Sequence, residues 1–264
     1  MRAHFHIICI LLAAMALSSC QRVIDIEVKS GATQLVIEGN ITNISGVQTI
    51  ALSSTVPYND ANVYPPVRGA VVTVSNNGLN YTFKETQAGI YTISNFRGKA
   101  SQVYTLKVQT DTKTYNATSA MVASPVTLDS VGISSLSIGS KTVKTISVFY
   151  HDQGGTPNQY RFVMWVNGVQ VKQIFAVNDA LTDGRMVNNT LYQDDITLKT
   201  GDKVEIEMQC IDKYVYNYWY SISQQGGNGP NNSATPSNPV SNIDNGALGY
   251  FSVHTTQRKS IIVL

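Results

Sequence analysis

The chain has 264 residues, with 19 Lys and Arg against 17 Asp and Glu. Only 14% of its residues are charged, against about 25% in ordinary soluble domains. This near neutrality argues against a nucleic-acid-binding protein, which needs a basic surface to attract phosphates. The 43% of hydrophobic residues excludes a disordered chain, and the length allows one large domain or two ordinary ones.

Residues 1–19 have the features of a secretory signal peptide. Arg2 gives the positive start, and the apolar stretch from Ile7 to Leu17 is too short for a permanent membrane span. The next residues, Leu17-Ser18-Ser19-Cys20, resemble a bacterial lipobox, in which the cysteine is lipidated and becomes the new N-terminus. We therefore expect a lipid anchor on Cys20 and a tether over residues 20–33. An ordinary signal peptide with a cysteine at the cleavage site is the alternative.

The expected state of each cysteine follows from this processing. Cys9 leaves with the signal peptide and Cys20 carries lipid, so Cys210 is the cysteine left to the mature chain, and no intramolecular disulfide is expected. Alternation over residues 204–210 places Cys210 on an apolar strand face. We expect a buried small hydrophobic residue there rather than a catalytic thiol.

Residues 34–123 predict a first β-sandwich module, because segments of strand length rich in Val, Ile, Thr and Tyr alternate with turn residues. In residues 104–108 the alternation is plain, with Tyr104, Leu106 and Val108 pointing inward. The predicted strands are 34–39, 47–53, 70–74, 81–85, 90–94, 104–108 and 114–121.

After a linker at Ser124-Pro125, residues 126–264 predict a second β-rich domain. Asn167-Gly168 is its strongest hairpin signal. The predicted strands are 128–138, 142–151, 159–166, 169–177, 203–211, 247–254 and 260–264. The chain is thus expected to be mainly β, with two β-sandwich-like modules, the first immunoglobulin- or transthyretin-like.

Residues 212–224 predict one amphipathic helix in the second domain. Apolar and aromatic residues recur there at intervals of three and four: Ile211, Tyr214, Val215, Tyr218, Trp219 and Ile222. Asp212 suits the N-terminal cap, and Gly226-Gly227 ends the helix. We expect this aromatic face to pack on a sheet, with sugar stacking as the alternative.

The segment 226–245 is a long loop in which fifteen of twenty residues are Gly, Pro, Asn or Ser. Loops of this length in compact domains tend to be functional or disordered, and both alternatives stay open. If it is ordered, it supplies a surface for a ligand or partner together with the helix. The candidate binding residues are Trp219, Asn228, Asn231, Asn232, Asn238 and Asn242.

Motifs for catalysis are missing from the sequence, which has no H-E-x-x-H, G-x-S-x-G, Walker or dinucleotide-binding pattern. His151-Asp152 precedes two glycines and predicts a capped turn rather than half of a catalytic triad. Four aspartates in one predicted loop region are candidates for calcium, but their spacing favours a solvated loop: Asp179, Asp183, Asp194 and Asp195. We expect no metal and no cofactor.

Beyond the lipobox, six segments carry a resemblance to a known family: residues 35–42, 67–72, 89–91, 104–106, 237–243 and 246–251. On these segments the chain resembles a Bacteroidota outer-membrane lipoprotein family described as domain of unknown function 4249, and its first half is similar to carboxypeptidase-regulatory-like, transthyretin-type sandwiches. The resemblance implies an outer-membrane lipoprotein often encoded near a TonB-dependent receptor, and it implies no catalytic residues. Asp129-Ser130-Val131 also resembles the O-glycosylation site of that phylum, which makes Ser130 a candidate for modification.

We therefore expect a non-enzymatic, lipid-anchored binding or accessory protein that acts with a TonB-dependent receptor in nutrient capture or uptake. The anchor does not decide between the cell surface and the periplasmic leaflet. The residues after Cys20 lack the dense acidic run that is typical of surface-export signals in this phylum. A structural or adhesive surface protein is one alternative. A carbohydrate- or peptide-processing enzyme is another, using the pair Asp194 and Asp195 or the pair Glu205 and Glu207, which share the outer face of a strand.

Overall fold

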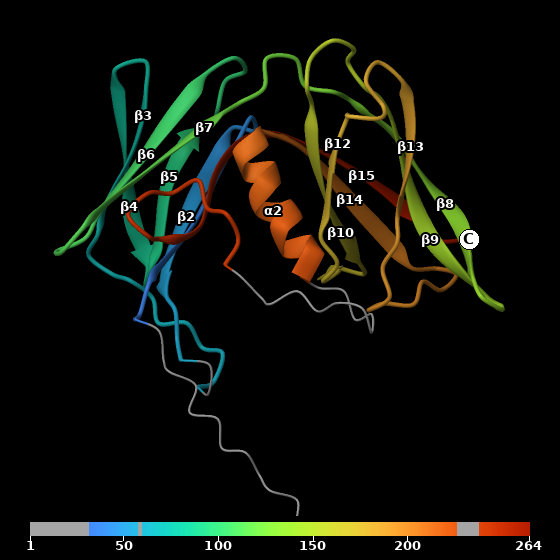
Figure 1. Ribbon diagram of the computed structural model, residues 1–264, viewed down its shortest axis with the longest axis horizontal. Coiled ribbons are helices and arrows are strands. Elements are labelled where there is room, and N and C mark those ends of the chain that lie inside the picture. Colours follow the sequence, from blue (N-terminus) through green and yellow to red (C-terminus); the bar gives the residue numbers. More distant parts are fainter. Residues whose placement is uncertain (1–31, 58–59, 226–237) are drawn as a thin grey trace, which may run out of the picture. The chain divides into compact units, whose positions relative to one another are not determined.

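The computed structural model describes residues 32–57, 60–225 and 238–264, and it confirms the expected mainly β fold (Figure 1). The strands of the first half are β1 (Leu35–Thr42), β2 (Gly46–Ser54), β3 (Val71–Asn76), β4 (Leu79–Gln87), β5 (Ile90–Phe96), β6 (Val103–Gln109) and β7 (Thr114–Ala120). Those of the second half are β8 (Leu128–Ile138), β9 (Lys141–His151), β10 (Gln159–Val166), β11 (Val169–Gln170), β12 (Phe175–Asn178), β13 (Met186–Leu191), β14 (Lys203–Ile211) and β15 (Leu248–Ile262). The helix α2 (Lys213–Gln225) lies between β14 and β15 in the chain, and no helix of the described ranges has the length and apolar character of a membrane span.

Within the described residues, the strands form one sheet of twelve and one of three. The large sheet runs in the order β11-β10-β14-β15-β1-β2-β5-β4-β3-β6-β7, with β12 also paired to β10, and the small sheet runs β13-β9-β8. The expected alternation holds in β6, where Tyr104, Leu106 and Val108 are buried and the residues between them are exposed. The side chains on one strand face therefore build a core, as a half-buried sheet requires.

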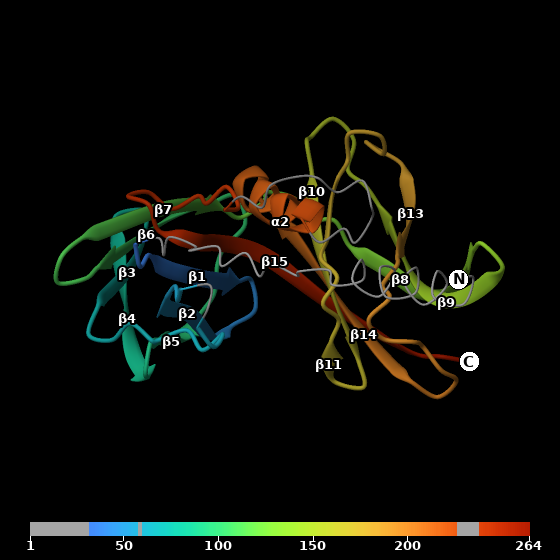
Figure 2. The same ribbon diagram turned by 60° about the horizontal axis from the view of Figure 1, so that its bottom comes forward.

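The strand β15 lies inside the large sheet, between β14 and β1, and pairs with these two partners in succession (Figure 2). Residues 248–254 pair in parallel with β1, and residues 255–262 pair antiparallel with β14. The prediction of two separate strands at 247–254 and 260–264 was therefore wrong. The polar residues 255–259 look like a connection in the sequence, but each of them lies opposite a residue of β14 in the antiparallel pairing.

Two further corrections concern the region between β10 and β14. The predicted strand 169–177 is divided into β11 and β12, which both pair with β10. The region of Asp179 to Asp195 was predicted as one loop, but it contains β13, which pairs with β9. The composition of β13, Met-Val-Asn-Asn-Thr-Leu, has two asparagines that favour turns, and pairing with β9 outweighs that preference.

Buried hydrophobic residues form three clusters. The first is built from β1–β7 with Phe251 and Val253 of β15, and the second from β8–β10, β13 and β14 with Val263. The third, smaller cluster holds Ile211, Val215, Tyr216 and Tyr250 and lies under α2. The last strand thus contributes to the first and third clusters directly, and Ile261 packs against the second. The division into two modules at Ser124-Pro125 stays a prediction.

Candidate functional site

The helix α2 begins where the sequence predicts, because Asp212 caps it. The Oδ1 atom of Asp212 accepts hydrogen bonds from the main-chain N–H groups of Tyr214 (2.9 Å) and Val215 (3.0 Å). Its Oδ2 atom accepts from the hydroxyl of Ser119 and from the N–H of Ala120 (3.2 Å). One carboxylate therefore satisfies two free donors at the helix start and also fixes the helix to the end of β7.

The aromatic face of α2 packs on the sheet, as expected. Tyr218 and Trp219 are half-buried, and their ring centroids lie 5.1 Å and 4.9 Å from that of the buried Tyr250. The amide of Asn40 on β1 donates to the hydroxyl of Tyr250 (3.0 Å). Burial raises the pKa of Tyr218 to about 12. These rings hold α2 in place.

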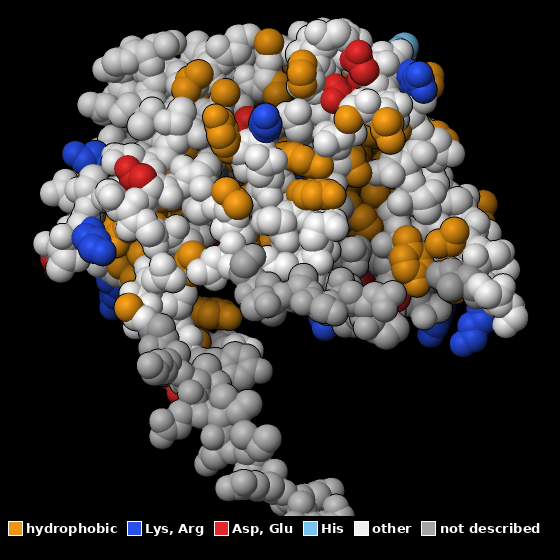
Figure 3. All heavy atoms as spheres, viewed as in Figure 1, with side chains coloured by type: hydrophobic (Ala, Val, Ile, Leu, Met, Phe, Trp, Pro, Cys, Tyr) orange, Lys and Arg blue, Asp and Glu red, His pale blue; other side chains and the backbone are white. Residues whose placement is uncertain are grey.

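The outer side of the helix carries exposed aromatic rings. Tyr214 is 66% exposed and Tyr220 is 44% exposed, and hydrophobic side chains gather over α2 in the space-filling view (Figure 3). The sequence pattern placed Tyr214 on the buried face, and this was wrong: Tyr216 is buried instead, with its hydroxyl accepting from the amide of Asn178 (3.1 Å). The contact with β12 turns the buried side of the helix toward Tyr216.

An arginine completes the aromatic group. The Cζ atom of Arg161, on β10, lies 3.6 Å from the ring centroid of Trp219, a cation–π distance. Its Nη1 donates to Oε1 of Gln209 on the neighbouring strand β14 (3.1 Å). Arg161 is half-buried, and this burial lowers the pKa of its guanidinium.

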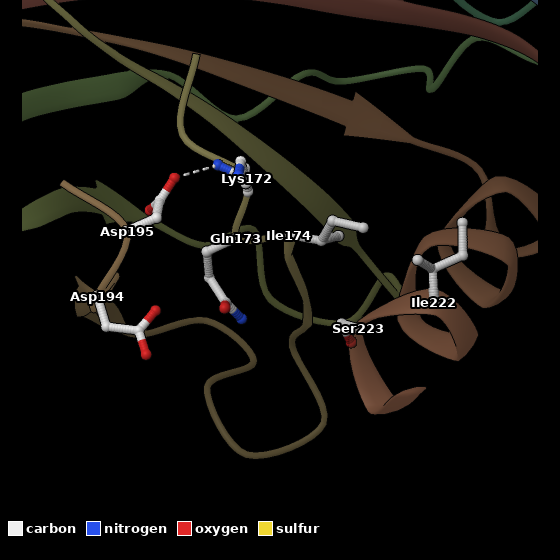
Figure 4. A pocket seen from close by; sticks show the side chains of 7 residues that line it. All are labelled: Lys172, Gln173, Ile174, Asp194, Asp195, Ile222 and Ser223. Carbon is white, nitrogen blue, oxygen red and sulfur yellow. Dashed lines mark hydrogen bonds between the residues drawn. The ribbon is translucent and has the colours of Figure 1, made fainter. Parts of the chain in front are cut away.

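Two adjoining pockets open beside this group. One, of about 290 Å³, is lined by the Arg161–Val163 stretch of β10, by residues 170–174 and by Trp219. The other, of about 410 Å³, shares Lys172, Gln173 and Ile174 with the first and adds Asp194, Asp195, Ile222 and Ser223. In Figure 4, Ile222 and Ser223 come from α2, while Asp194 and Asp195 lie on the opposite side. We take these two pockets, called here the α2 pockets, as the candidate site.

Charge is unevenly distributed between the α2 pockets. The smaller one has two cations in its lining, Arg161 and Lys172, and no acidic residue among the lining residues described. The larger one has both aspartates, and Oδ2 of Asp195 accepts from the main-chain N–H of Lys172 (2.8 Å). The site therefore has a positive end and a negative end.

A second pair of pockets lies around Arg258, with volumes of about 330 and 490 Å³. The guanidinium of Arg258 contacts Glu205 (2.9 Å) and Glu207 (2.6 Å) and lies 4.8 Å from the ring of Trp165. The two glutamates do share a strand face, as predicted. However, the Glu207 side chain is only 8% exposed, so this face is not simply the outer one. Arg258 covers it.

The side chains of three other aspartates lie together, away from the α2 pockets. Carboxylate oxygens of Asp152, Asp179 and Asp183 lie within 4.8 Å of one another. Each accepts hydrogen bonds: Asp152 from the hydroxyl of Tyr160 and the N–H of Gly184, Asp179 from the N–H of Asn158, and Asp183 from the N–H of Gly155. The turn at Gly154-Gly155 is bound by Asp183 rather than by Asp152, which is buried, and the expectation that Asp179 is solvated was wrong, since it is buried as well.

The remaining candidates are dispersed. Cys210 is buried, as predicted, and burial raises the pKa of its thiol. Ser130 is exposed on β8, and its O-glycosylation stays a prediction. Cys20, Asn228, Asn231 and Asn232 lie outside the described residues.

Of the loop 226–245, residues 238–245 are described. Asn238 is exposed there, whereas Asn242 is engaged by the protein itself. Its amide donates to the carbonyl of Phe251 (2.7 Å) and its Oδ1 accepts from the N–H of the same residue (2.9 Å). Asn242 therefore anchors the end of the loop to β15.

Sequence reasoning identified Trp219, Asp194 and Asp195 but missed Arg161 and Lys172. One signal was present for Arg161: it is the charged residue in Gln-Tyr-Arg-Phe-Val-Met-Trp-Val, an otherwise apolar strand. Charged residues are rare at such positions unless they have a partner or a role. Lys172 lies in the short connection between β11 and β12, which the sequence did not reveal.

Comparison with known proteins gives one family match. The model of a family described as "Domain of unknown function (DUF4249)" matches residues 21–260, nearly all of the chain. No curated protein matches the chain.

Proposed function

We propose, from the premise that this chain belongs to the DUF4249 family, that it is a lipid-anchored binding protein of the outer membrane. We further propose that it acts with a TonB-dependent receptor in capturing a small nutrient molecule. The observation that carries the anchor is the sequence Leu17-Ser18-Ser19-Cys20 after an apolar stretch. Several acyl chains on Cys20 would hold the protein at a membrane without a spanning helix, since each buried methylene contributes about 0.8 kcal/mol.

The α2 pockets support a binding role. They are concave, they combine aromatic and aliphatic walls with a few charged groups, and together they have the size of small-molecule sites. Trp219 is held by Tyr250 and Arg161, so the wall is preorganised before any ligand arrives.

The glutamate pair considered for an enzyme is arranged in a way that favours binding over catalysis. Glu205 and Glu207 both contact Arg258, which neutralises the pair. A general acid in a glycosidase needs a raised pKa, and Glu207 has a lowered one. Burial raises its pKa, but the hydrogen bonds from Gln209 and Arg258 and the positive charge of Arg258 outweigh that effect.

The lipid anchor is tested by labelling the protein in its host with an alkyne-bearing fatty acid. Labelling of the wild type and its loss in Cys20→Ser are expected, together with release of the variant from the membrane fraction. Cys210→Ser is the matched control, because its buried thiol should leave the label unchanged. An unlabelled wild-type protein would contradict the anchor.

The receptor partnership is tested by affinity purification from native outer membranes after mild crosslinking. A co-purifying TonB-dependent receptor supports the proposal. If deletion of the gene impaired attachment and left nutrient uptake unchanged, the structural or adhesive alternative would replace it.

A further inference from the structure

Each of the two tryptophans of the chain carries an arginine on its ring. Arg258 lies over Trp165, with Cζ 4.8 Å from the ring centroid, and Arg161 lies over Trp219 at 3.6 Å. The two pairs are chemically alike, and both line pockets. They can therefore be compared directly.

The two arginines differ in how their charge is neutralised. Arg258 has two glutamate partners, at 2.9 and 2.6 Å. Arg161 has the neutral amide of Gln209 as its hydrogen-bond acceptor, and within the described ranges it forms no ion pair. A guanidinium has five N–H donors and stays protonated in proteins, so most of its donors have no acceptor among those residues.

A partly desolvated charge without an ion-pair partner is costly, and the carboxylate of Glu207, which lies beyond ion-pair distance, and the stacking on Trp219 offset only part of that cost. Burial lowers the pKa of Arg161, in line with this cost. Lys172 adds a second positive charge to the same pocket, and the amides of Gln170 and Gln173 add polar groups to its wall. An anion in the pocket would supply the missing acceptors.

The lining of the larger α2 pocket indicates the chemistry of the other half of the ligand. Asp194 and Asp195 are exposed there, and carboxylates accept hydrogen bonds from hydroxyl groups. A singly charged, planar carboxylate matches the fork of a guanidinium. A doubly charged phosphate would be repelled more strongly by the two aspartates nearby.

We propose that the α2 pockets bind a small polyhydroxylated carboxylic acid, with its carboxylate on Arg161 and Lys172 and its hydroxyl groups toward Asp194 and Asp195. This inference rests on the proposed binding function, for which it names the ligand class. The positive end of the site selects the acid, and the negative end rejects ligands with a second acidic group.

The tryptophans allow a direct test with the full chain purified from membranes in detergent. In Trp165→Phe, Trp219 is the remaining tryptophan and its fluorescence reports on Arg161. In Trp219→Phe, Trp165 reports on Arg258. Titration with D-galacturonate to about 10 mM, above the Kd of weak small ligands, should change the fluorescence of Trp219 and leave that of Trp165 unchanged.

Two further probes define the ligand class. D-galactose, which lacks the carboxylate, should bind at least about 10-fold more weakly, the value of a lost charge-assisted hydrogen bond. Glucose 6-phosphate should also bind more weakly than D-galacturonate. Equal or tighter binding of either probe would overturn the proposal, as would no response of Trp219 to D-galacturonate.

Variants locate the binding. Arg161→Gln should weaken D-galacturonate binding by about 10- to 100-fold. Lys172→Met, at an exposed position, should weaken D-galacturonate binding by about 3-fold or more. If Arg161→Gln does not fold, the Lys172→Met variant tests the site in its place. Lys203→Met, in the lining of the Arg258 pocket, is the matched control and should bind as the wild type does. Unchanged binding in Lys172→Met would overturn the inference.

The outcome is separable from that of the proposed function. Failure of the acid to bind contradicts the ligand class alone. Failure of fatty-acid labelling or of receptor co-purification contradicts the proposed function and leaves the binding measurement standing.

Discussion

Gly249 on β15 faces the main-chain carbonyl of Ile37 on β1 so closely that a Cβ atom added to it would lie 2.0 Å from that oxygen. Its φ of +90° is also one that residues with a side chain rarely adopt. This glycine lies in the parallel pairing that joins the last strand to the first. Only a residue without a side chain allows the two backbones to approach in this way.

Gly249→Ala is therefore expected to lower the free energy of unfolding by about 3 kcal/mol or more, from backbone strain and the clash with Ile37 together. Gly246→Ala is the control, since Gly246 has a φ of +78° but no heavy atom within 4 Å of an added Cβ. It should cost about 1 to 2 kcal/mol from strain alone. Urea unfolding of the full chain measures both, and equal losses would show that the carbonyl contact is unimportant.

The buried His254 predicts a specific sensitivity to acid. Burial lowers its pKa from 6.5 to about 4, so below pH 6.5 the unfolded chain binds a proton that the folded chain does not. Stability should therefore fall between about pH 6.5 and 4, by about 2 to 3 kcal/mol from this residue. In His254→Gln, the difference in unfolding free energy between pH 7.5 and 4.5 should shrink by that amount. An unchanged difference would refute the role of His254.

Asp212 caps α2 and links it to β7, so replacing Asp212 should weaken both the helix cap and this link. Asp212→Ala should destabilise the protein by about 1 to 3 kcal/mol, through the lost helix cap and the lost bonds from Ser119 and Ala120. Asp212→Asn keeps a capping oxygen and should recover part of this loss. If both variants lose the same amount in chemical denaturation, the cap contributes little.

The Arg258 pair predicts unequal effects of its two glutamates. Glu205→Gln should cost less than about 1 kcal/mol, because its side chain is 33% exposed. Glu207→Gln should cost more, about 1 to 3 kcal/mol, because its carboxylate is more deeply buried and accepts from Arg258 and Gln209. Thermal unfolding at pH 7 compares the two, and a larger loss in Glu205→Gln would contradict this order.

The sequence was most informative where local chemistry decides the structure. Asp212 predicted the start of α2, and alternation predicted the buried residues of β6. It was least informative about β15, whose central residues 255–259 are polar and become strand because β14 lies beside them. Pairing across such distances is set by tertiary structure rather than by propensity.

The same limit applies to the candidate site. Trp219 stood out as an aromatic residue on a helix face, but its partner Arg161 lies 58 positions earlier and meets it only when α2 packs on β10. An arginine in an apolar strand is visible in the sequence. The sequence does not show which ring this arginine contacts, nor that Glu205 and Glu207 form their ion pairs with Arg258.

The position of β15 has a consequence for biogenesis. This strand fills the gap between β1 and β14, and it follows every other described strand in the chain. Until residues 248–262 are available for pairing, β1 and β14 both present open hydrogen-bonding edges, which are prone to pair with other chains. Completion of the large sheet must therefore wait for this last strand, and a chaperone that shields these edges would act on the chain just before that strand arrives.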